Sequence, residues 1–190
     1  MQVMRKKYQS ASAFTLLELL VVLSIFVIIA SLSIANYRGS NRESQLKMAT
    51  QELVANIKLA QSYALGSKEF VSRTDPRSGQ VPSGGWGVHF SVYNPGEYEI
   101  VADFDGNHVW DSQRDGLFKE VELPEKISIT KLIYRSSTVS NLDIFFEPPD
   151  PQTFLNQDKE GNATIVLYDD LLATTSEVTV NFFGLVEITK

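Results

Sequence analysis

The residues best suited to chemistry form a group of oxygen donors between positions 103 and 111. The candidate ligands are Asp103, Asp105, Asn107, the carbonyl of Val109, and Asp111, with Asp115 nearby. Hard oxygen donors at alternating positions suit Ca²⁺, so calcium is the one cofactor that these residues suggest. Gly106 falls two places earlier than an EF-hand loop requires, and Arg114 replaces its final acid. Residues of these types also build ordinary turns between strands, so a calcium site and a simple turn both stay open.

The two histidines add little to this chemistry. His89 lies on the polar side of a predicted strand and is expected at the surface, and His108 lies within the acidic stretch. The sequence has no nucleophile motif, no phosphate-binding loop and no pair of histidines at metal-ligand spacing. It also has no cysteine, which excludes thiol catalysis, thiolate metal sites and disulfides. We therefore expect a protein that is not an enzyme.

The charge of the chain argues against nucleic acid as a partner. The 190 residues carry a formal net charge of −6, and removing residues 1–13 would take away Arg5, Lys6 and Lys7 and leave −9. An acidic protein gains nothing from neutralising phosphates.

An apolar run at residues 14–35 is the element that is expected to position the rest of the chain. It contains 22 residues and one charge, Glu18. As a helix it would be about 33 Å long, enough to cross the roughly 30 Å of membrane hydrocarbon. The basic flank before it predicts a cytoplasmic N-terminus and an exported remainder.

Three interpretations compete for this run. It could be a plain membrane anchor. It could be a secretory signal cleaved after Ser33-Ile34-Ala35, although apolar regions of such signals span roughly 7–15 residues. It could also follow a leader that is cleaved on the cytoplasmic side, between Ala13 and Phe14.

Glu18 favours the third interpretation. A carboxylate costs about 3 kcal/mol at the centre of a membrane, and less near its edge. Cleavage between Ala13 and Phe14 would create an amine one helical turn from Glu18, and the amine of a neighbouring subunit could pair with this acid. Inside an apolar helix bundle the pair would be strongly preferred, because either charge alone would be uncompensated.

Residues 13–22, AFTLLELLVV, resemble the type III leader-peptide motif of type IV pilins and type II secretion pseudopilins. The resemblance implies cleavage between Ala13 and Phe14 by a prepilin peptidase and methyltransferase, with N-methylation of Phe14. It also implies assembly through Glu18 with other pilin subunits and an assembly platform protein. Two features depart from the family pattern: Ala13 replaces the usual Gly, and no Pro stands near Ala35.

The remaining sequence predicts a helix followed by a β-rich head. Apolar residues recur at steps of three and four and so share one helical face: Leu46, Ala49, Leu53, Ile57, Ala60 and Ala64. Gly39-Ser40 is a weak point in this helix, and Gly66 is its expected stop. Alternating apolar residues then predict strands at 86–92, 98–102, 127–133, 142–146, 163–168 and 178–182, with a terminal hairpin at Gly184.

We therefore expect an α+β, pilin-like fold. A long N-terminal α-helix, with a transmembrane half and an amphipathic half, packs on an antiparallel β-sheet head. The expected divisions are a cytoplasmic leader at 1–13, a transmembrane and assembly helix at 14–35, an amphipathic helix at 36–66, and an exported head at 67–190.

Three looser features of the head resemble the H-type minor pseudopilin (GspH/FimT-like) branch. They are Gly85-Trp86-Gly87-Val88, the segment at 103–107, and the closing segment VNFFGLV. The basic tail through which some relatives bind DNA is missing, so that function is not carried over. The predicted function is a minor pseudopilin or minor pilin of the cytoplasmic membrane, built into a type II secretion pseudopilus or a type IV pilus. The alternative is a single-pass, membrane-anchored module that binds calcium or another ligand and does not polymerise.

Overall fold

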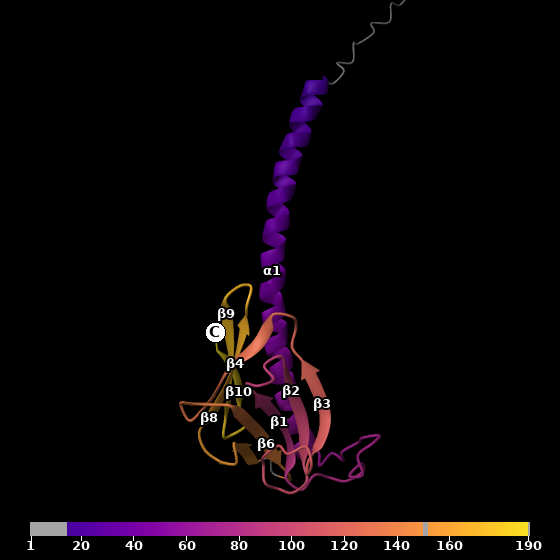
Figure 1. The fold of residues 1–190 in the computed structure, drawn as a ribbon, viewed down its shortest axis with the longest axis vertical. Helices are drawn as coiled ribbons and strands as arrows, with labels where there is room; N and C mark the ends of the chain where they lie inside the picture. The colour runs from indigo at the N-terminus through magenta and orange to yellow at the C-terminus, as the bar shows by residue number, and fades with distance from the viewer. Residues whose placement is uncertain (1–14, 150–151, 190) are drawn as a thin grey trace, which may run out of the picture. The chain divides into compact units, whose positions relative to one another are not determined.

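The computed structural model describes residues 15–149 and 152–189, and it describes no side chains at 32–43. The predicted leader and the residues of its cleavage site, Ala13 and Phe14, lie outside this part of the chain. By its internal contacts the chain divides into a unit that ends at residue 41 and a second unit that begins at residue 42, and each is described by itself. Helix α1 (Leu16–Leu65) is the first element and is drawn in indigo and violet in Figure 1.

The first unit exposes its apolar side chains. In the described part of α1, large apolar residues from Leu16 to Ile29 are about half exposed or more. Across the described residues, no helix is at once long enough and apolar enough to span a membrane. The span predicted at 14–35 includes residues outside the described set, and it stays a prediction.

The second part of α1 buries the face that its sequence predicts. The six residues spaced by three and four are each at most 6% exposed: Leu46, Ala49, Leu53, Ile57, Ala60 and Ala64. The assigned helix runs through Gly39-Ser40 without a break, so the expected weak point does not interrupt it. It ends just before Gly66, as predicted, and Ser67 then adopts a left-handed conformation with φ 44°.

The head of the second unit contains two antiparallel sheets rather than the one sheet expected. The first has the order β3 (Gly116–Glu122), β2 (Glu97–Asp103), β1 (Gly85–Ser91), β6 (Asn141–Glu147), β7 (Gln152–Leu155). The second has the order β10 (Val186–Thr189), β9 (Thr174–Asn181), β8 (Asn162–Asp169), β4 (Ile127–Tyr134), β5 (Ser137–Val139). Residues of α1 and of both sheets share one apolar core, so the predicted α+β class of a helix packed on an antiparallel β head is confirmed.

Two glycines show how closely the head is packed. Gly87 in β1 faces Phe145 of β6, where an added Cβ would lie 2.4 Å from the ring. Gly184 adopts φ 76° in the turn between β9 and β10, which confirms the predicted hairpin. A Cβ at Gly184 would lie 2.6 Å from Nε2 of Gln61, so this turn rests directly on the last turns of α1.

A second, smaller apolar cluster lies on the face of the first sheet that points away from the main core. Val101, Phe145 and Phe154 form it, and Trp110 packs against it from the loop that follows β2. His108 from the same loop stacks on Phe154 with ring centroids 3.6 Å apart. These contacts hold the acidic loop at 104–115 against the sheet and fix the position of its carboxylates.

Candidate functional site

Glu18 is the residue predicted to act in assembly, and the structure places it in a capping box with Thr15. Thr15 Oγ1 accepts the backbone N–H of Glu18 at 3.2 Å, and Glu18 Oε2 accepts the backbone N–H of Thr15 at 3.3 Å. The Thr15 hydroxyl also donates to Oε2 at 3.1 Å. These bonds satisfy two of the N–H groups that a helix start leaves unpaired. The T-x-x-E spacing was visible in the sequence, but only Glu18 was singled out there.

Asp103 is the centre of the acidic loop. Its Oδ1 accepts backbone N–H groups from Asp105 at 3.1 Å and Gly106 at 2.7 Å, and its Oδ2 accepts that of His108 at 2.8 Å. The residue is fully buried. Burial raises the pKa of Asp103 above its usual range, although the bonds from His108 and Gly106 oppose this shift. The loop is thus folded around one carboxylate.

The other predicted ligands are engaged mostly with their own backbone. Asp105 Oδ1 accepts the Asn107 backbone N–H at 3.2 Å, and Asn107 Oδ1 accepts the Val109 N–H at 2.7 Å. Asp111 accepts the Gln113 N–H at 2.9 Å. Each of these bonds belongs to a local turn of the kind that Asp and Asn favour. The turn interpretation therefore describes the geometry of this loop well.

Asp115 brings a further acid to the same place. Its two oxygens accept the N–H groups of Phe104 at 3.1 Å and Asp111 at 3.0 Å. Burial raises the pKa of Asp115 to about 6, because the ionised form loses its hydration. Within residues 15–149 and 152–189, one oxygen from each of Asp103, Asp105 and Asp115 lies within 4.8 Å of the others. These three acids, rather than the alternating set, could share a cation.

The histidines lie in more structured surroundings than the sequence suggested. His89 faces away from the main core, as its position in the strand predicts, but its side chain is only 16% exposed. Its Nδ1 lies 2.7 Å from Oδ1 of Asp143, a residue 54 positions away that sits directly opposite on β6. His89 thus lies on the outward face as expected, but it is largely covered and paired with Asp143. Only the register of β1 and β6 reveals this pair.

Comparison with known proteins adds evidence of a different kind. Residues 9–34 match the model of the prokaryotic N-terminal methylation motif. Two fimbrial proteins of Pseudomonas aeruginosa are each 33% identical to this chain over 76 residues, which is 40% of the chain and 49% of the relative. The chain thus spans about half the length of the curated relatives it matches. No solved structure matches.

These similarities confirm the resemblance drawn from residues 13–22. The chain carries a prepilin-type N-terminal motif, and it is similar to fimbrial proteins over part of its length. The assignment to the H-type branch, the cleavage site and the calcium ligands stay predictions.

Proposed function

We propose that this chain is a minor pilin or minor pseudopilin of the H-type branch. It is inserted in the cytoplasmic membrane, cleaved between Ala13 and Phe14, and N-methylated on Phe14. The methylation motif at residues 9–34 is the observation that carries this proposal. The exposed apolar side chains from Leu16 to Ile29, which lie within this motif on α1, support it, because an unpaired apolar surface of this kind needs a lipid or a protein partner.

Assembly depends on Glu18 in this proposal. The described donors to its carboxylate are the N–H and hydroxyl of Thr15, both neutral. A methylated amine from the Phe14 of a neighbouring subunit would be a charged donor, and charge-assisted hydrogen bonds are roughly twice as strong as neutral ones. The capping box holds the carboxylate at the start of the helix until such an amine arrives.

The head is exported, and the finished subunit belongs to a filament at the outer face of the cytoplasmic membrane or at the cell surface. Its partners are other pilin or pseudopilin subunits, the prepilin peptidase and methyltransferase, and an assembly platform protein. The filament is a type II secretion pseudopilus or a type IV pilus.

The mass of the mature N-terminal peptide tests this function. Methylated Phe14 as the first residue is the expected result. An intact leader in cells that process other prepilins would contradict it. That outcome would favour the alternative, a membrane-anchored module that does not polymerise.

The convergence of Asp103, Asp105 and Asp115 within 4.8 Å supports a calcium-binding role as part of either function. Oxygen ligands in an irregular loop suit Ca²⁺ better than Mg²⁺, which demands a tighter octahedral shell. Ion binding would compete with the backbone N–H groups that now occupy Asp103. Backbone N–H groups occupy both oxygens of Asp115 in the same way. Asp105, whose Oδ2 accepts from the side chains of Asn107 and Arg114, would therefore bind with the least rearrangement.

A further inference from the structure

A cavity of about 620 Å³ opens on the face of the first sheet that points away from the main core. Outward-facing residues of β1 and β2 form its floor, including His89 and Glu99. The segments around Arg77 and Trp110 form its walls, and the turn at Tyr93 lies at its edge. Its volume falls within the range of roughly 300–1,000 Å³ that is typical of binding sites.

A row of ionisable side chains crosses the sheet at this floor. Strand register places His89 between Asp143 on β6 and Glu99 on β2, and places Glu120 on β3 opposite Glu99. His89 turns its Nδ1 to Asp143. Glu99 therefore faces Glu120, with Trp110 as a side-chain hydrogen-bond donor beside it, and like charges directly opposite one another destabilise a sheet.

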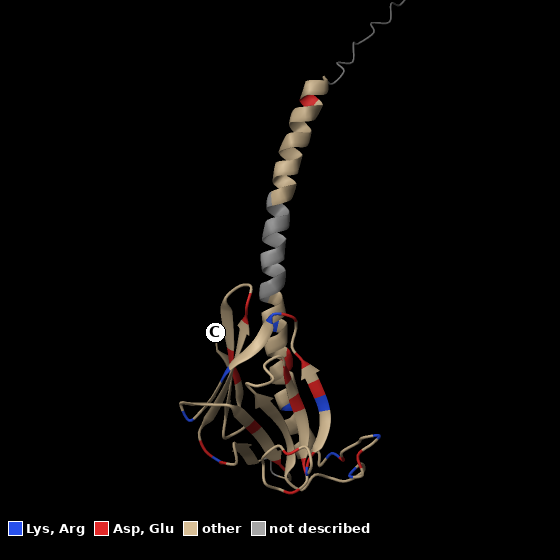
Figure 2. Cartoon of the chain, in the orientation of Figure 1, with Lys and Arg blue, Asp and Glu red and all other residues tan. Residues whose placement is uncertain are grey.

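A second pair of acids repeats this arrangement. Glu97 lies opposite Glu122 in the next outward-facing position of the same two strands, and Figure 2 shows the concentration of acidic residues along β2 and β3. Contact with Glu120, followed by burial, raises the pKa of Glu97, and burial is the main cause of the raised pKa of Glu99. Both shifts mean that the ionised forms are disfavoured here, and a cation would relieve this repulsion.

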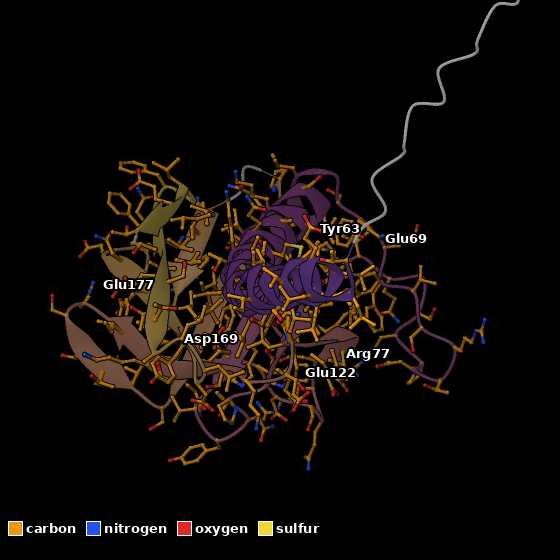
Figure 3. All side chains as sticks on the ribbon, turned by 90° about the horizontal axis from the view of Figure 1, so that it is seen from above. Tyr63, Glu69, Arg77, Glu122, Asp169 and Glu177 are labelled. Atoms are coloured by element: carbon orange, nitrogen blue, oxygen red, sulfur yellow. The ribbon has the colours of Figure 1, made fainter. Side chains whose placement is uncertain are left out.

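The arginine at this cavity cannot serve an anionic ligand. Of the described residues that line the cavity, Arg77 alone carries a permanent positive charge. Its guanidinium bonds to both oxygens of Asp75, at 2.8 and 2.6 Å, and to the carbonyl of Arg114. Arg77 and Glu122 lie on the same side of the second unit (Figure 3). Arg77 therefore stabilises the wall of the cavity, and the charged side chains that remain for a ligand there, Glu97 and Glu99, are acidic.

Aromatic side chains indicate what kind of cation would fit. Trp110 lines the wall, and Tyr93 at the edge is 76% exposed. Aromatic faces attract ammonium and guanidinium groups, and exposed tyrosine and tryptophan are enriched where proteins meet. A free cation would use only the floor, whereas a side chain carried by a protein would also cover Tyr93.

We propose that this cavity binds a basic side chain, an arginine or a lysine, presented by an adjacent protein subunit. The guanidinium or ammonium group lies against Glu97 and Glu99, beside Trp110, and the backbone that carries it contacts Tyr93. The binding of the cation does not depend on the proposed filament function; only the identity of the partner as a filament subunit rests on it.

The full chain in detergent micelles allows a direct test with N-acetyl-argininamide. The chain has two tryptophans, so two indole N–H signals are expected in nuclear magnetic resonance spectra, and Trp110→Phe assigns them. The Trp110 signal should shift with added probe, whereas that of Trp86, which is 1% exposed, should not. N-acetyl-citrullinamide is the neutral control of the same shape. Equal shifts with both probes, or none with either, overturn the proposal.

Charge variants locate the site. Glu99→Gln should weaken binding of the arginine probe about tenfold, because one charge-assisted hydrogen bond is lost. Glu187→Gln is the matched control, since it removes the same charge from an exposed position on β10 in the other sheet. An equal loss of affinity in both variants would mean that the probe responds only to overall charge, which overturns the site.

A photo-crosslinking residue at position 93 distinguishes a protein partner from a free cation. In assembling cells it should give a product with another filament subunit, and Glu99→Gln should abolish that product. Probe binding without any cross-linked product overturns the protein partner and leaves a small-cation site. N-terminal processing is measured in the same cells: a retained leader would count against the proposed function, whereas it would leave the cavity assignment intact.

Discussion

The start of α1 and the acidic loop of the head are two sites built in opposite ways. At the start of α1, Thr15 and Glu18 are three residues apart, and the described hydrogen bonds of their side chains all lie within this pair. In the head, Asp103 and Asp115 are brought together by a loop that Trp110 and His108 hold against a distant strand. The first site can be identified from a short stretch of sequence; the second requires the fold. Changes at the first should alter processing and assembly, and changes at the second should alter stability.

The largest effect should come from Ala13→Leu. A long side chain should not fit a peptidase site that selects small residues, so the leader should stay attached. Immunoblots against the head should show the precursor alone. Ala11→Leu, two residues earlier, is the matched control and should be processed normally. Normal cleavage of Ala13→Leu would mean that the cut lies elsewhere.

Glu18→Val should separate insertion from assembly. Removing the acid removes a cost of up to about 3 kcal/mol in the membrane, so insertion should be unchanged or improved. Cross-linking to neighbouring subunits should fall, because the Phe14 amine loses its partner. Thr15→Val provides the control, since it removes the cap hydroxyl but keeps the carboxylate and should cost only about 1 kcal/mol at the helix start. Undiminished cross-linking of Glu18→Val would rule out the pairing.

Gly87→Ala should affect the head and leave the N-terminal site untouched. The added methyl group would lie 2.4 Å from the ring of Phe145. Crowding of this kind typically lowers the free energy of unfolding by about 1–3 kcal/mol, and we expect a loss of that size here. The melting temperature should fall, while cleavage between Ala13 and Phe14 continues. Gly96→Ala is the control, because nothing lies within 4 Å of the position of its Cβ. Equal melting of the two variants would contradict the packing described for β1.

Calcium should stabilise the head if the acidic loop binds it. An ion at a hundredfold excess over its Kd contributes about 2.7 kcal/mol to the free energy of unfolding. The melting temperature in millimolar calcium should therefore exceed that in chelator by several degrees, and magnesium should do less. Asp105→Ala should abolish the difference, and Asp170→Ala, at an exposed turn in the other sheet, should not. Identical melting curves would leave the loop as an ordinary turn.

The smallest effect concerns pH. The pKa of Asp115 is about 6 in the folded head, against a usual 3.8. The folded state thus holds this proton more tightly than the unfolded state. Protonation of Asp115 therefore contributes fully to the free energy of unfolding below about pH 3.8, and this contribution is lost as pH rises through 6. The wild type should gain stability relative to Asp115→Asn when pH falls from 7 to 5. A constant difference between the two proteins over that range would contradict the raised pKa.

The same contrast explains what the sequence could predict. The buried face of α1 was predicted residue by residue, because helical periodicity depends only on spacing along the chain. Six strands were predicted from alternation, but β3 (GLFKEVE) was missed because its pattern of burial is broken, and β5 and β7 are short. The division into two sheets and the pairing of His89 with Asp143 depend on strand register between distant segments. Local spacing holds no information about that register.

The turn at Gly184 implies an order in which the parts of the head fold. It rests on Gln61 of α1 and on Thr153 and Phe146 of the first sheet, across a separation of more than 120 residues from the helix. Contacts between such distant segments form late, because a long loop must close first. During export, as proposed here, the end of α1 would emerge well before the turn that covers it. The head would remain open over that stretch of helix until residues 181–185 have crossed, so the apolar face of α1 beneath the turn would be exposed for the longest time.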